Sequence, residues 1–316
     1  MEILKFPLAL TSFIVAATFS LVATSPVIRA SARVGALDVP RDDRRMHTRA
    51  VPRAGGIAIF TAFALALCFY CRGEFSPIVA SALTGGAIMT ALGLCDDVSP
   101  LPPKVKLAGE CCVALIPLAF GAFPEGIELF GKYFPLPTAI CVALSFLWII
   151  TVTNALNLID GLDGLASGVS FVVAAAILLR NLLFSHNAEC VAVCASLAGA
   201  LFGFLPYNAK NAKIFMGDCG SLSLGYILSL LALVGTGRSS VSPLAVSPLA
   251  ALLLLGYPLA DTTLAVIRRA KAGTGIFTAD KSHIHHRLCR SGLACAEAVL
   301  TLLCATALLC CISMAL

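Results

Sequence analysis

Ten long stretches of this chain contain no charged residue, and they constrain its fold more than any other feature. They occupy 6–28, 54–71, 75–95, 111–124, 133–159, 164–179, 190–209, 219–237, 239–260 and 298–316. A helix needs about 20 apolar residues to cross the hydrocarbon core of a bilayer. Eight of the stretches meet that requirement, whereas 111–124 and 164–179 reach it only by borrowing from the preceding segment. The sequence therefore predicts an all-α integral membrane protein with about ten transmembrane helices, built as one polytopic domain over 1–316.

Composition excludes several other classes. Hydrophobic residues make up 59% of the chain and charged residues 12%, against about 25% charged in a soluble domain. So few charges argue against a soluble globule, a secreted disulfide scaffold, a nucleic-acid-binding protein and a disordered tail. Most of the 14 cysteines lie inside the apolar stretches, where a free Cys behaves as a small hydrophobic residue.

The basic residues predict an orientation. Of the 22 Lys and Arg, 17 lie in the loops that follow odd-numbered helices, about 29–53, 96–107, 153–163, 208–218 and 268–293. Cytoplasmic loops carry the excess of Lys and Arg in membrane proteins, so we expect these loops in the cytoplasm and both termini outside. A cleaved signal peptide ending near Ala30-Ser31-Ala32 is the competing interpretation of the first stretch, but cleavage would break this charge parity.

The chemically useful side chains share that side. All ten Asp and four of the five His lie in or beside the same five loops. Simple solvation would scatter carboxylates over both faces, so this one-sided set predicts an active site at the cytoplasmic face.

The segment GLCDDVSPLPPKVKL contains the adjacent carboxylates Asp96 and Asp97. Neighbouring carboxylates raise each other's pKa unless a cation neutralises them, and Mg²⁺ takes oxygen ligands of this kind. The alternative is a polar end of the third helix with Lys104 and Lys106 as counter-charges, although negative charge at a helix C-terminus is unfavourable.

Two further segments carry carboxylates. In NALNLIDGLDGLASG, the residues Asn157, Asp160 and Asp163 repeat every third position and would share one face of a helix. In KIFMGDCGSLSLG, Asp218 precedes the eighth helix, whose first N–H groups would attract phosphate oxygens. In both segments an ordinary N-cap is the alternative role for an Asp.

The last loop contains KSHIHHRL, in which His283 and His286 are three residues apart. These side chains and Arg287 suit the binding of a diphosphate. A transition-metal site is less favoured because no carboxylate or Cys completes the ligand set. A basic stretch resting on anionic lipid headgroups is the remaining alternative.

Together these segments carry a family resemblance. DDRRMHTRAVPRAGG, GLCDDVSPLPPKVKL, NALNLIDGLDGLASG, IFMGDCGSLSLG and HIHHRL resemble the five signature loops of the polyprenyl-phosphate N-acetylhexosamine-1-phosphate transferases, in family order over about 40–290. The resemblance implies transfer of a sugar-1-phosphate from a UDP-sugar to a polyprenyl phosphate in the bilayer, with release of UMP. It also implies dependence on Mg²⁺, with Mn²⁺ as the alternative ion, a bacterial cytoplasmic membrane location, and a homodimer as in some relatives.

The resemblance also implies roles for individual residues. Asn157 and Asp218 would hold the metal, and Asp96, the proposed base, and Asp97 would border the lipid phosphate. The histidines would act on the diphosphate or sugar, which completes a catalytic set of Asp96, Asp97, His283, His285 and His286. The expected substrate-binding residues are His47, Arg53, Lys106, Asn154, Asp160, Asp163 and Arg287.

The histidine motif separates two branches of that family. HIHH is similar to the branch that uses UDP-GlcNAc or a related UDP-HexNAc and starts O-antigen (lipopolysaccharide), teichoic acid or other cell-surface glycans. The peptidoglycan branch, the phospho-N-acetylmuramoyl-pentapeptide transferases, has three consecutive His where Ile284 interrupts the run here. Two positions depart from the family pattern: Asn211 stands where Pro is common, and Cys219 where Thr is.

Two other classes fit less well. A CDP-alcohol phosphotransferase would share the spacing of Asp160, Asp163 and Gly164, but Ser167 and Gly168 stand where its Ala-Arg pair should follow. A transporter should carry charges in mid-span and show inverted repeats, whereas the carboxylates here gather at the cytoplasmic ends of the predicted helices.

Overall fold

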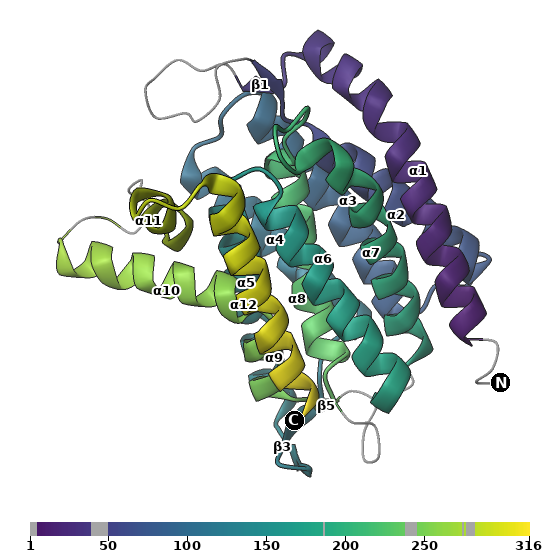
Figure 1. The fold of residues 1–316 in the computed structure, drawn as a ribbon. Helices are drawn as coiled ribbons and strands as arrows, with labels where there is room; N and C mark the ends of the chain where they lie inside the picture. Colours follow the sequence, from purple (N-terminus) through teal and green to yellow (C-terminus); the bar gives the residue numbers. More distant parts are fainter. Residues whose placement is uncertain (1–4, 39–49, 186, 238–244, 274, 276–281) are drawn as a thin grey trace.

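The computed structural model describes residues 5–38, 50–185, 187–237, 245–273, 275 and 282–316. The expected residue His47 and the loop residues around it lie outside these ranges. Twelve α-helices run through the described residues (Figure 1): α1 Lys5–Val34, α2 Gly55–Cys71, α3 Pro77–Val98, α4 Pro103–Phe120, α5 Thr138–Leu158, α6 Leu165–Arg180, α7 Ala188–Asn208, α8 Gly217–Val234, α9 Pro248–Leu254, α10 Gly256–Lys271, α11 Ile284–Arg290 and α12 Cys295–Met314.

Short strands join the helices at the two ends of the bundle. Near the carboxylate-rich loops, β1 (Leu37–Asp38) pairs antiparallel with β2 (Val51–Pro52). At the other end, β3 (Gly126–Leu129) lies between β4 and β5 in a three-stranded sheet. It pairs antiparallel with β4 (Lys132–Pro135) and parallel with β5 (Ala245–Val246).

The all-α membrane architecture is confirmed, while the number of spans stays a prediction. Within the described residues, seven helices are long and apolar enough to cross a membrane, or eight if one bent pair counts as a span. The shorter apolar helix α2 has 17 residues, and α4 carries Lys104, Lys106 and Glu110. Helix α5 continues to Leu158, so Asn154 and Asn157 lie in this helix.

The expectation of one helix over 239–260 is wrong for the part of the segment that the structure describes, which begins at Ala245. The structure places two helices there, α9 and α10, whose axes meet at 82°. Pro258 has no N–H to donate to Leu254, the last residue of α9, so an uninterrupted helix would lose that bond. The helix α10 then leaves the bundle sideways (Figure 1). It exposes Leu264 and Ile267 and ends in Arg268, Arg269 and Lys271.

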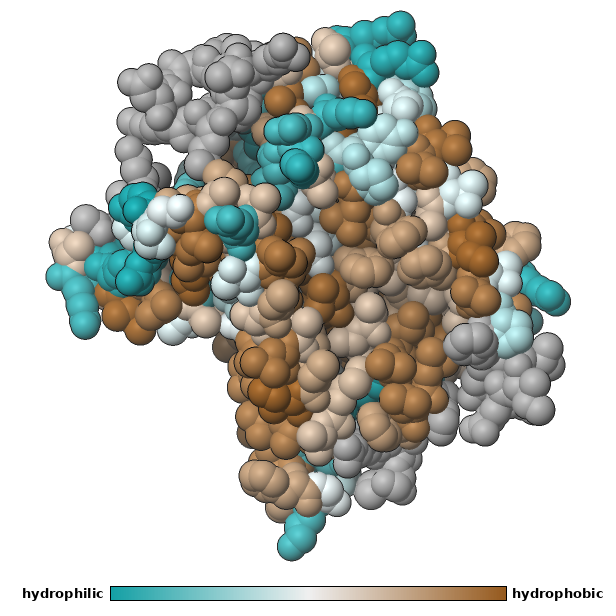
Figure 2. Space-filling model, in the orientation of Figure 1, coloured by the Kyte–Doolittle hydropathy of each residue, from teal (hydrophilic) through white to brown (hydrophobic). Residues whose placement is uncertain are grey.

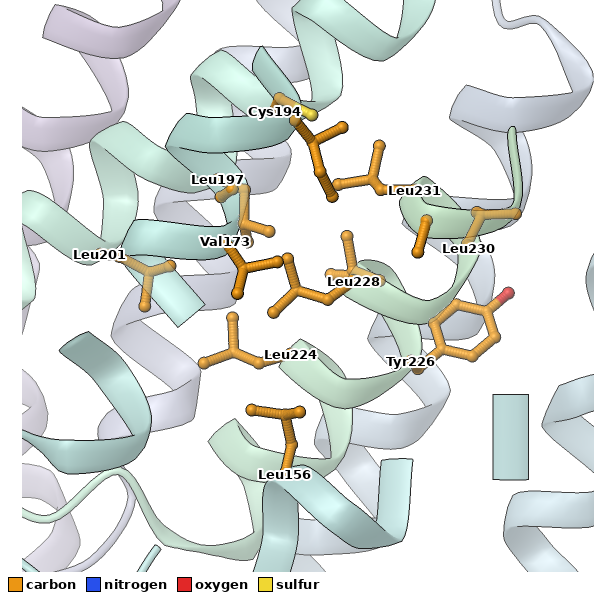
Figure 3. Close-up of a cluster of buried hydrophobic side chains, with 14 of the residues drawn as sticks. Leu156, Val173, Cys194, Leu197, Leu201, Leu224, Tyr226, Leu228, Leu230 and Leu231 are labelled. Carbon is orange, nitrogen blue, oxygen red and sulfur yellow. The ribbon is translucent and has the colours of Figure 1, made fainter. Parts of the chain in front are cut away.

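Helix α8 forms the centre of the bundle, and 94% of its residues are buried. Figure 3 shows its leucines, among them Leu224 and Leu228, pointing toward Val173 of α6 and Leu197 of α7. Its polar first turn is thereby surrounded by the ends of neighbouring helices. The outermost helix α1 packs on α7 at Gly199, where a Cβ would overlap the carbonyl oxygen of Phe13.

The surface is divided between apolar and polar zones. In Figure 2 a hydrophobic band covers the outer helices, and hydrophilic residues gather at the end near β1 and around α10 and α11. One of the basic residues outside the five predicted cytoplasmic loops is not on the surface at all. Arg180, the last residue of α6, is 1% exposed and donates hydrogen bonds to the carbonyl oxygens of Thr236 and Ser313.

Candidate active site

The first turn of α8 is capped by a side chain from α3. Asp97 Oδ1 and Oδ2 accept hydrogen bonds from the backbone N–H groups of Asp218 and Cys219, both at 3.0 Å. Arg53 Nε lies 2.9 Å from Asp97 Oδ1, and the Asp97 side chain is fully buried. The N-terminus of a helix favours an anion. The carboxylate of Asp97 therefore occupies the N-terminus of α8, where phosphate oxygens were expected from the sequence.

Asp218 itself faces three polar groups from other segments. Asn157 Nδ2 donates to Asp218 Oδ1 at 3.2 Å and to Ser221 Oγ at 2.8 Å. Arg53 Nη2 lies 3.6 Å from Asp218 Oδ1, and Lys106 Nζ forms an ion pair with Asp218 Oδ2. Residues from the β2–α2 loop, α4 and α5 therefore converge on one carboxylate of α8.

The ammonium group of Lys106 sits where three oxygen atoms from distant segments meet. Besides Asp218 Oδ2, its neighbours are Asp96 Oδ2 at 3.3 Å and Asn157 Oδ1 at 3.4 Å. Asp96 is held in place because its Oδ1 accepts from the backbone N–H of Leu101 at 2.6 Å. We call this set the carboxylate cluster: Arg53, Asp96, Asp97, Lys106, Asn157 and Asp218.

The donor set around that ammonium group suits a hard divalent cation. Two carboxylates and one amide oxygen already surround a positive charge, and Mg²⁺ prefers such oxygen ligands. In the part of the chain that the structure describes, no three His, Cys, Asp or Glu side chains are grouped to hold a metal ion. A metal at this point would therefore need the amide oxygen of Asn157 and a displaced Lys106 ammonium.

The turn after α5 does not form the helical face expected for Asn157, Asp160 and Asp163. Only Asn157 lies in a helix, because α5 ends at Leu158 and α6 begins at Leu165. Burial, together with the negative charges of Asp218 and Asp97, raises the pKa of Asp160 to about 7, and Arg53 partly offsets this. Its neighbour Asp163 accepts a hydrogen bond from the backbone N–H of Ala212 at 2.8 Å.

The backbone conformation next to the Asp163 contact explains one departure from the family pattern. Ala212 follows Lys210 and Asn211, whose φ angles are 48° and 59°. Proline cannot adopt such an angle, because its ring holds φ near −65°. Asn tolerates the left-handed conformation, so the turn between α7 and α8 here requires a residue other than Pro at 211.

The histidines form a second group beside this turn, with an aspartate that the sequence analysis did not include among the site residues. His283 Nδ1 lies 2.6 Å from Asp261 Oδ2, and the N–H of Ile284 donates to Asp261 Oδ1 at 2.7 Å. The rings of His283 and His285 stack with centroids 5.7 Å apart at 5°, and His286 lies 4.3 Å from His285. We call Asp261, His283, His285 and His286 the histidine cluster.

His285 connects the histidine cluster to the turn after α5. Its ring packs so closely on Gly161 that a Cβ there would overlap Nε2. Burial lowers the pKa of His285 to about 4, and the adjacent His286 contributes in the same direction. His285 is therefore a neutral imidazole at pH 7, while Gly161 places the histidine cluster next to Asp160.

The remaining expected residues lie at the edges of these two clusters. Asn154 donates to Glu110 of α4 and, at 3.0 Å, to the carbonyl oxygen of Ile150. Arg287 is exposed and lines an open surface hollow with Ser282, Ser291, Arg268 and Arg290. Among the described residues, the ion pairs of the carboxylate cluster do not include Arg287.

Sequence reasoning missed Asp261, Glu110 and Ser221 as site residues. A signal was present for the first, since Asp261 is the single charged residue between Arg238 and Arg268. Glu110 was likewise the one acidic residue within the extended fourth span. An isolated charge in an apolar segment needs a partner, but the partner could not be identified before the helices were packed.

Comparison with known proteins gives a consistent set of relatives. A family model described as glycosyl transferase family 4 matches residues 79–236, which include three of the five motif segments. The chain is 37% identical to a probable undecaprenyl-phosphate N-acetylglucosaminyl 1-phosphate transferase of Bacillus subtilis, over 92% of this chain and 80% of that protein. It is 33% identical to a decaprenyl-phosphate N-acetylglucosaminephosphotransferase of Mycobacterium tuberculosis, over 88% and 74%. It is 27% identical to an undecaprenyl-phosphate alpha-N-acetylglucosaminyl 1-phosphate transferase of Escherichia coli K12, over 88% and 75%.

Proposed function

The chain belongs to glycosyl transferase family 4, and from that membership we propose that it transfers GlcNAc-1-phosphate from UDP-GlcNAc to undecaprenyl phosphate. The products are undecaprenyl-diphosphate-linked GlcNAc and UMP. The observation that carries the proposal is the convergence of Asp96, Asn157 and Asp218 on one cation. An enzyme that joins two phosphate-bearing substrates needs such an electrostatic centre.

The proposed metal is Mg²⁺, with Mn²⁺ as the alternative. Asp218 and Asn157 would hold it, and Asp96 is the third oxygen donor in reach of the same point. When bound, the ion would neutralise charge on the diphosphate of the donor. Lys106 would then be released from these oxygens and could pair with a phosphate group. Arg53 supplies a second cation at the same place, anchored by Asp97.

The reaction we propose is a single displacement. A lipid phosphate oxygen forms a bond to the β-phosphorus of the UDP-sugar, and the bond from that phosphorus to the α–β bridging oxygen breaks. The electron pair leaves on UMP. A phosphate monoester has a second pKa near 6, so the acceptor is mostly dianionic at pH 7 and needs little help from the proposed base Asp96.

The alternative is a two-step route through a phospho-aspartyl enzyme on Asp96 or Asp97. The buried Asp97 carboxylate is occupied by two backbone N–H groups and Arg53, which argues against its use as a nucleophile. A single turnover with labelled UDP-GlcNAc and no lipid acceptor separates the routes. A labelled protein adduct would replace our mechanism by the two-step one.

The sugar and the pathway rest on the histidine motif. Ile284 interrupts the run of His, so we propose UDP-GlcNAc, or a related UDP-HexNAc, and not the muramoyl-pentapeptide donor. The product would start a cell-surface glycan such as O-antigen or teichoic acid. We further propose that the enzyme acts at the cytoplasmic face of the bacterial inner membrane, with both termini outside, and forms a homodimer.

The deciding experiment offers two donors to detergent-purified protein with Mg²⁺ and undecaprenyl phosphate. UDP-GlcNAc and UDP-MurNAc-pentapeptide are tested separately, and UMP and lipid-linked product are both measured. We expect product from UDP-GlcNAc only and none after chelation with EDTA. Product from the muramoyl donor only would overturn the assignment of the sugar. Folded protein that turns over no UDP-sugar at all would overturn the assignment of the enzyme.

A further inference from the structure

We infer that Asp261 is a positioning residue, which holds His283 in one tautomer and one orientation for the transfer reaction. The inference deepens the proposed function and rests on it, because His283 matters to catalysis only if the histidine cluster meets the sugar diphosphate. The juxtaposition itself is a property of the fold. The contact of Asp261 with His283 and Ile284 joins α10, the second helix of the bent pair, to the N-terminus of α11.

The burial of Asp261 is the first argument. Its side chain is 0% exposed, and an ionised carboxylate in such a place is costly unless hydrogen bonds compensate it. Both oxygens are satisfied, Oδ2 by His283 Nδ1 at 2.6 Å and Oδ1 by the Ile284 N–H at 2.7 Å. Asp261 therefore fixes the imidazole and the first residue of α11 with the same group.

The hydrogen-bonding capacities decide the tautomer. A carboxylate only accepts hydrogen bonds, so His283 must carry its proton on Nδ1. The other nitrogen, Nε2, then has no partner among the residues that the structure describes. In the neutral ring Nε2 can accept a hydrogen bond, and after protonation it can donate one to a phosphate oxygen. An Asp–His pair that fixes the ring in this way is a recurring device for orienting a catalytic imidazole.

The stacked rings connect this orientation to the rest of the site. His283 is parallel to His285 at 5.7 Å between centroids, and His285 packs on Gly161 next to Asp160. A displaced His283 ring would therefore change the surroundings of His285, which lies against the turn that precedes α6.

Three variants test the inference. In Asp261→Asn, the amide oxygen can still accept from Ile284, but the NH₂ group would face Nδ1 and move the ring proton to Nε2. In His283→Asn, an N–H remains near the place of Nδ1 to meet Asp261, but Nε2 is lost. The third is the double variant, and Thr263→Ala, an exposed neighbour on α10, is the matched control.

We expect Asp261→Asn and His283→Asn each to lower kcat by about 10²-fold or more, with KM for UDP-GlcNAc changed by less than fivefold. The double variant should be no slower than the worse single variant, because both remove the same interaction. Losses that multiply, or an Asp261→Asn enzyme within twofold of wild-type kcat, would overturn the inference. A merely structural role would lower the melting temperature of Asp261→Asn without coupling to His283.

A second readout separates this inference from the proposed function. The chain has five His, so ¹⁵N-labelled imidazoles can be assigned by single substitutions. We expect the Nδ1–H tautomer for His283 in the wild-type protein and the Nε2–H tautomer in Asp261→Asn. The same tautomer in both proteins would contradict the inference. If the wild-type protein turns over no donor, the proposed function fails, and the spectrum still decides whether Asp261 sets the tautomer.

Discussion

Single residues decide how closely the two clusters approach each other, and Gly161 is the clearest case. It separates Asp160 from Leu162 in the turn after α5, and the His285 ring occupies the space that a Cβ would need. Gly161 thus lies between Asp160, whose pKa is raised by charges of the carboxylate cluster, and the stacked rings of the histidine cluster. No other residue type leaves room for that contact.

We expect Gly161→Ala to lower kcat/KM for UDP-GlcNAc by at least about tenfold, because the methyl group must displace His285 and a small misplacement of a catalytic group is costly. Gly168→Ala in the same motif is the control, since its Cβ would meet only the flexible end of Leu303, at 3.0 Å. Steady-state assays with both variants check the prediction. Equal activity of the two would show that the packing on Gly161 is irrelevant to catalysis.

Because the imidazole of His285 is buried, we expect the stability of α11 to depend on pH. Its pKa is lowered to about 4 in the folded protein by burial and by His286, whereas an unfolded His titrates near 6.5. Between these values the opened segment binds more protons than the packed one, so acidification favours opening, and above pH 6.5 the effect is absent.

Amide exchange of residues 284–290, corrected for intrinsic rates, should therefore accelerate by up to about tenfold per pH unit as pH falls from 6.5 toward 4. His285→Gln, which cannot titrate, should show no such slope. A wild-type profile that is flat over this window would mean that His285 is not buried as a neutral ring.

At the scale of the elements, helix ends are joined by side chains from distant segments. Asp97 at the end of α3 caps the start of α8, and Asp261 of α10 caps the start of α11. Arg180 does the equivalent at the far end of the bundle, where it binds carbonyl groups beyond α8 and within α12. The contacts of Asp97, of Asp261 and of Arg180 with Ser313 satisfy backbone groups that a helix end leaves without an intrahelical partner.

Replacement of Arg180 by Met should destabilise the protein without changing its chemistry. The carbonyl oxygens of Thr236 and Ser313 would lose these donors in a buried place, at a cost of about 1–3 kcal/mol for each unsatisfied group. We expect a lower melting temperature in detergent and an unchanged kcat at low temperature. The melting temperature of Arg180→Lys should lie between those of the wild-type protein and Arg180→Met, because an ammonium group cannot reproduce the hydrogen bonds of the planar guanidinium group. An unchanged melting temperature for Arg180→Met would contradict this role.

The segment 239–260 shows why apolar length alone misjudges an element. Its run of uncharged residues is long enough for a span, yet the structure divides it into α9 and α10 at 82°. Pro258 has no N–H with which to continue the hydrogen bonding of α9, and Asp261 on the second helix contacts His283 and Ile284 at the start of α11. Mean hydropathy over a long segment does not reveal such local effects.

At the scale of the whole molecule, the distribution of charge predicts an orientation that can be measured. The loops with the carboxylate and histidine clusters carry 17 of the 22 basic residues, so they should face the cytoplasm. An even number of crossings then leaves both termini outside. In Figure 1 the start of α1 and the end of α12 lie toward the same end of the bundle, while the number of crossings and the side of the termini stay predictions.

An epitope tag placed after Leu316 should be removed by protease added to intact spheroplasts. In a variant whose 14 native cysteines are replaced, a single cysteine reporter at Lys104 should react with an impermeant maleimide only after lysis. Lys104 is exposed in the loop-facing first turn of α4. A protected C-terminal tag together with a protected Lys104 reporter would mean an even number of crossings between Lys104 and the C-terminus. The predicted topology needs an odd number there and would have to be revised.

The sequence by itself determined the class of the protein and its family, and it predicted the polar loops of the candidate site. These depend on local properties: apolar length, the one-sided distribution of charge, and short motifs read along the chain. Only the tertiary structure decided which of those polar residues contact one another. Asp97 caps α8 and Lys106 lies among the proposed metal ligands. Asp261 pairs with His283, 22 residues away. Such contacts are set by how helices pack against each other, and side-chain periodicity within one helix contains no information about the residue on the next.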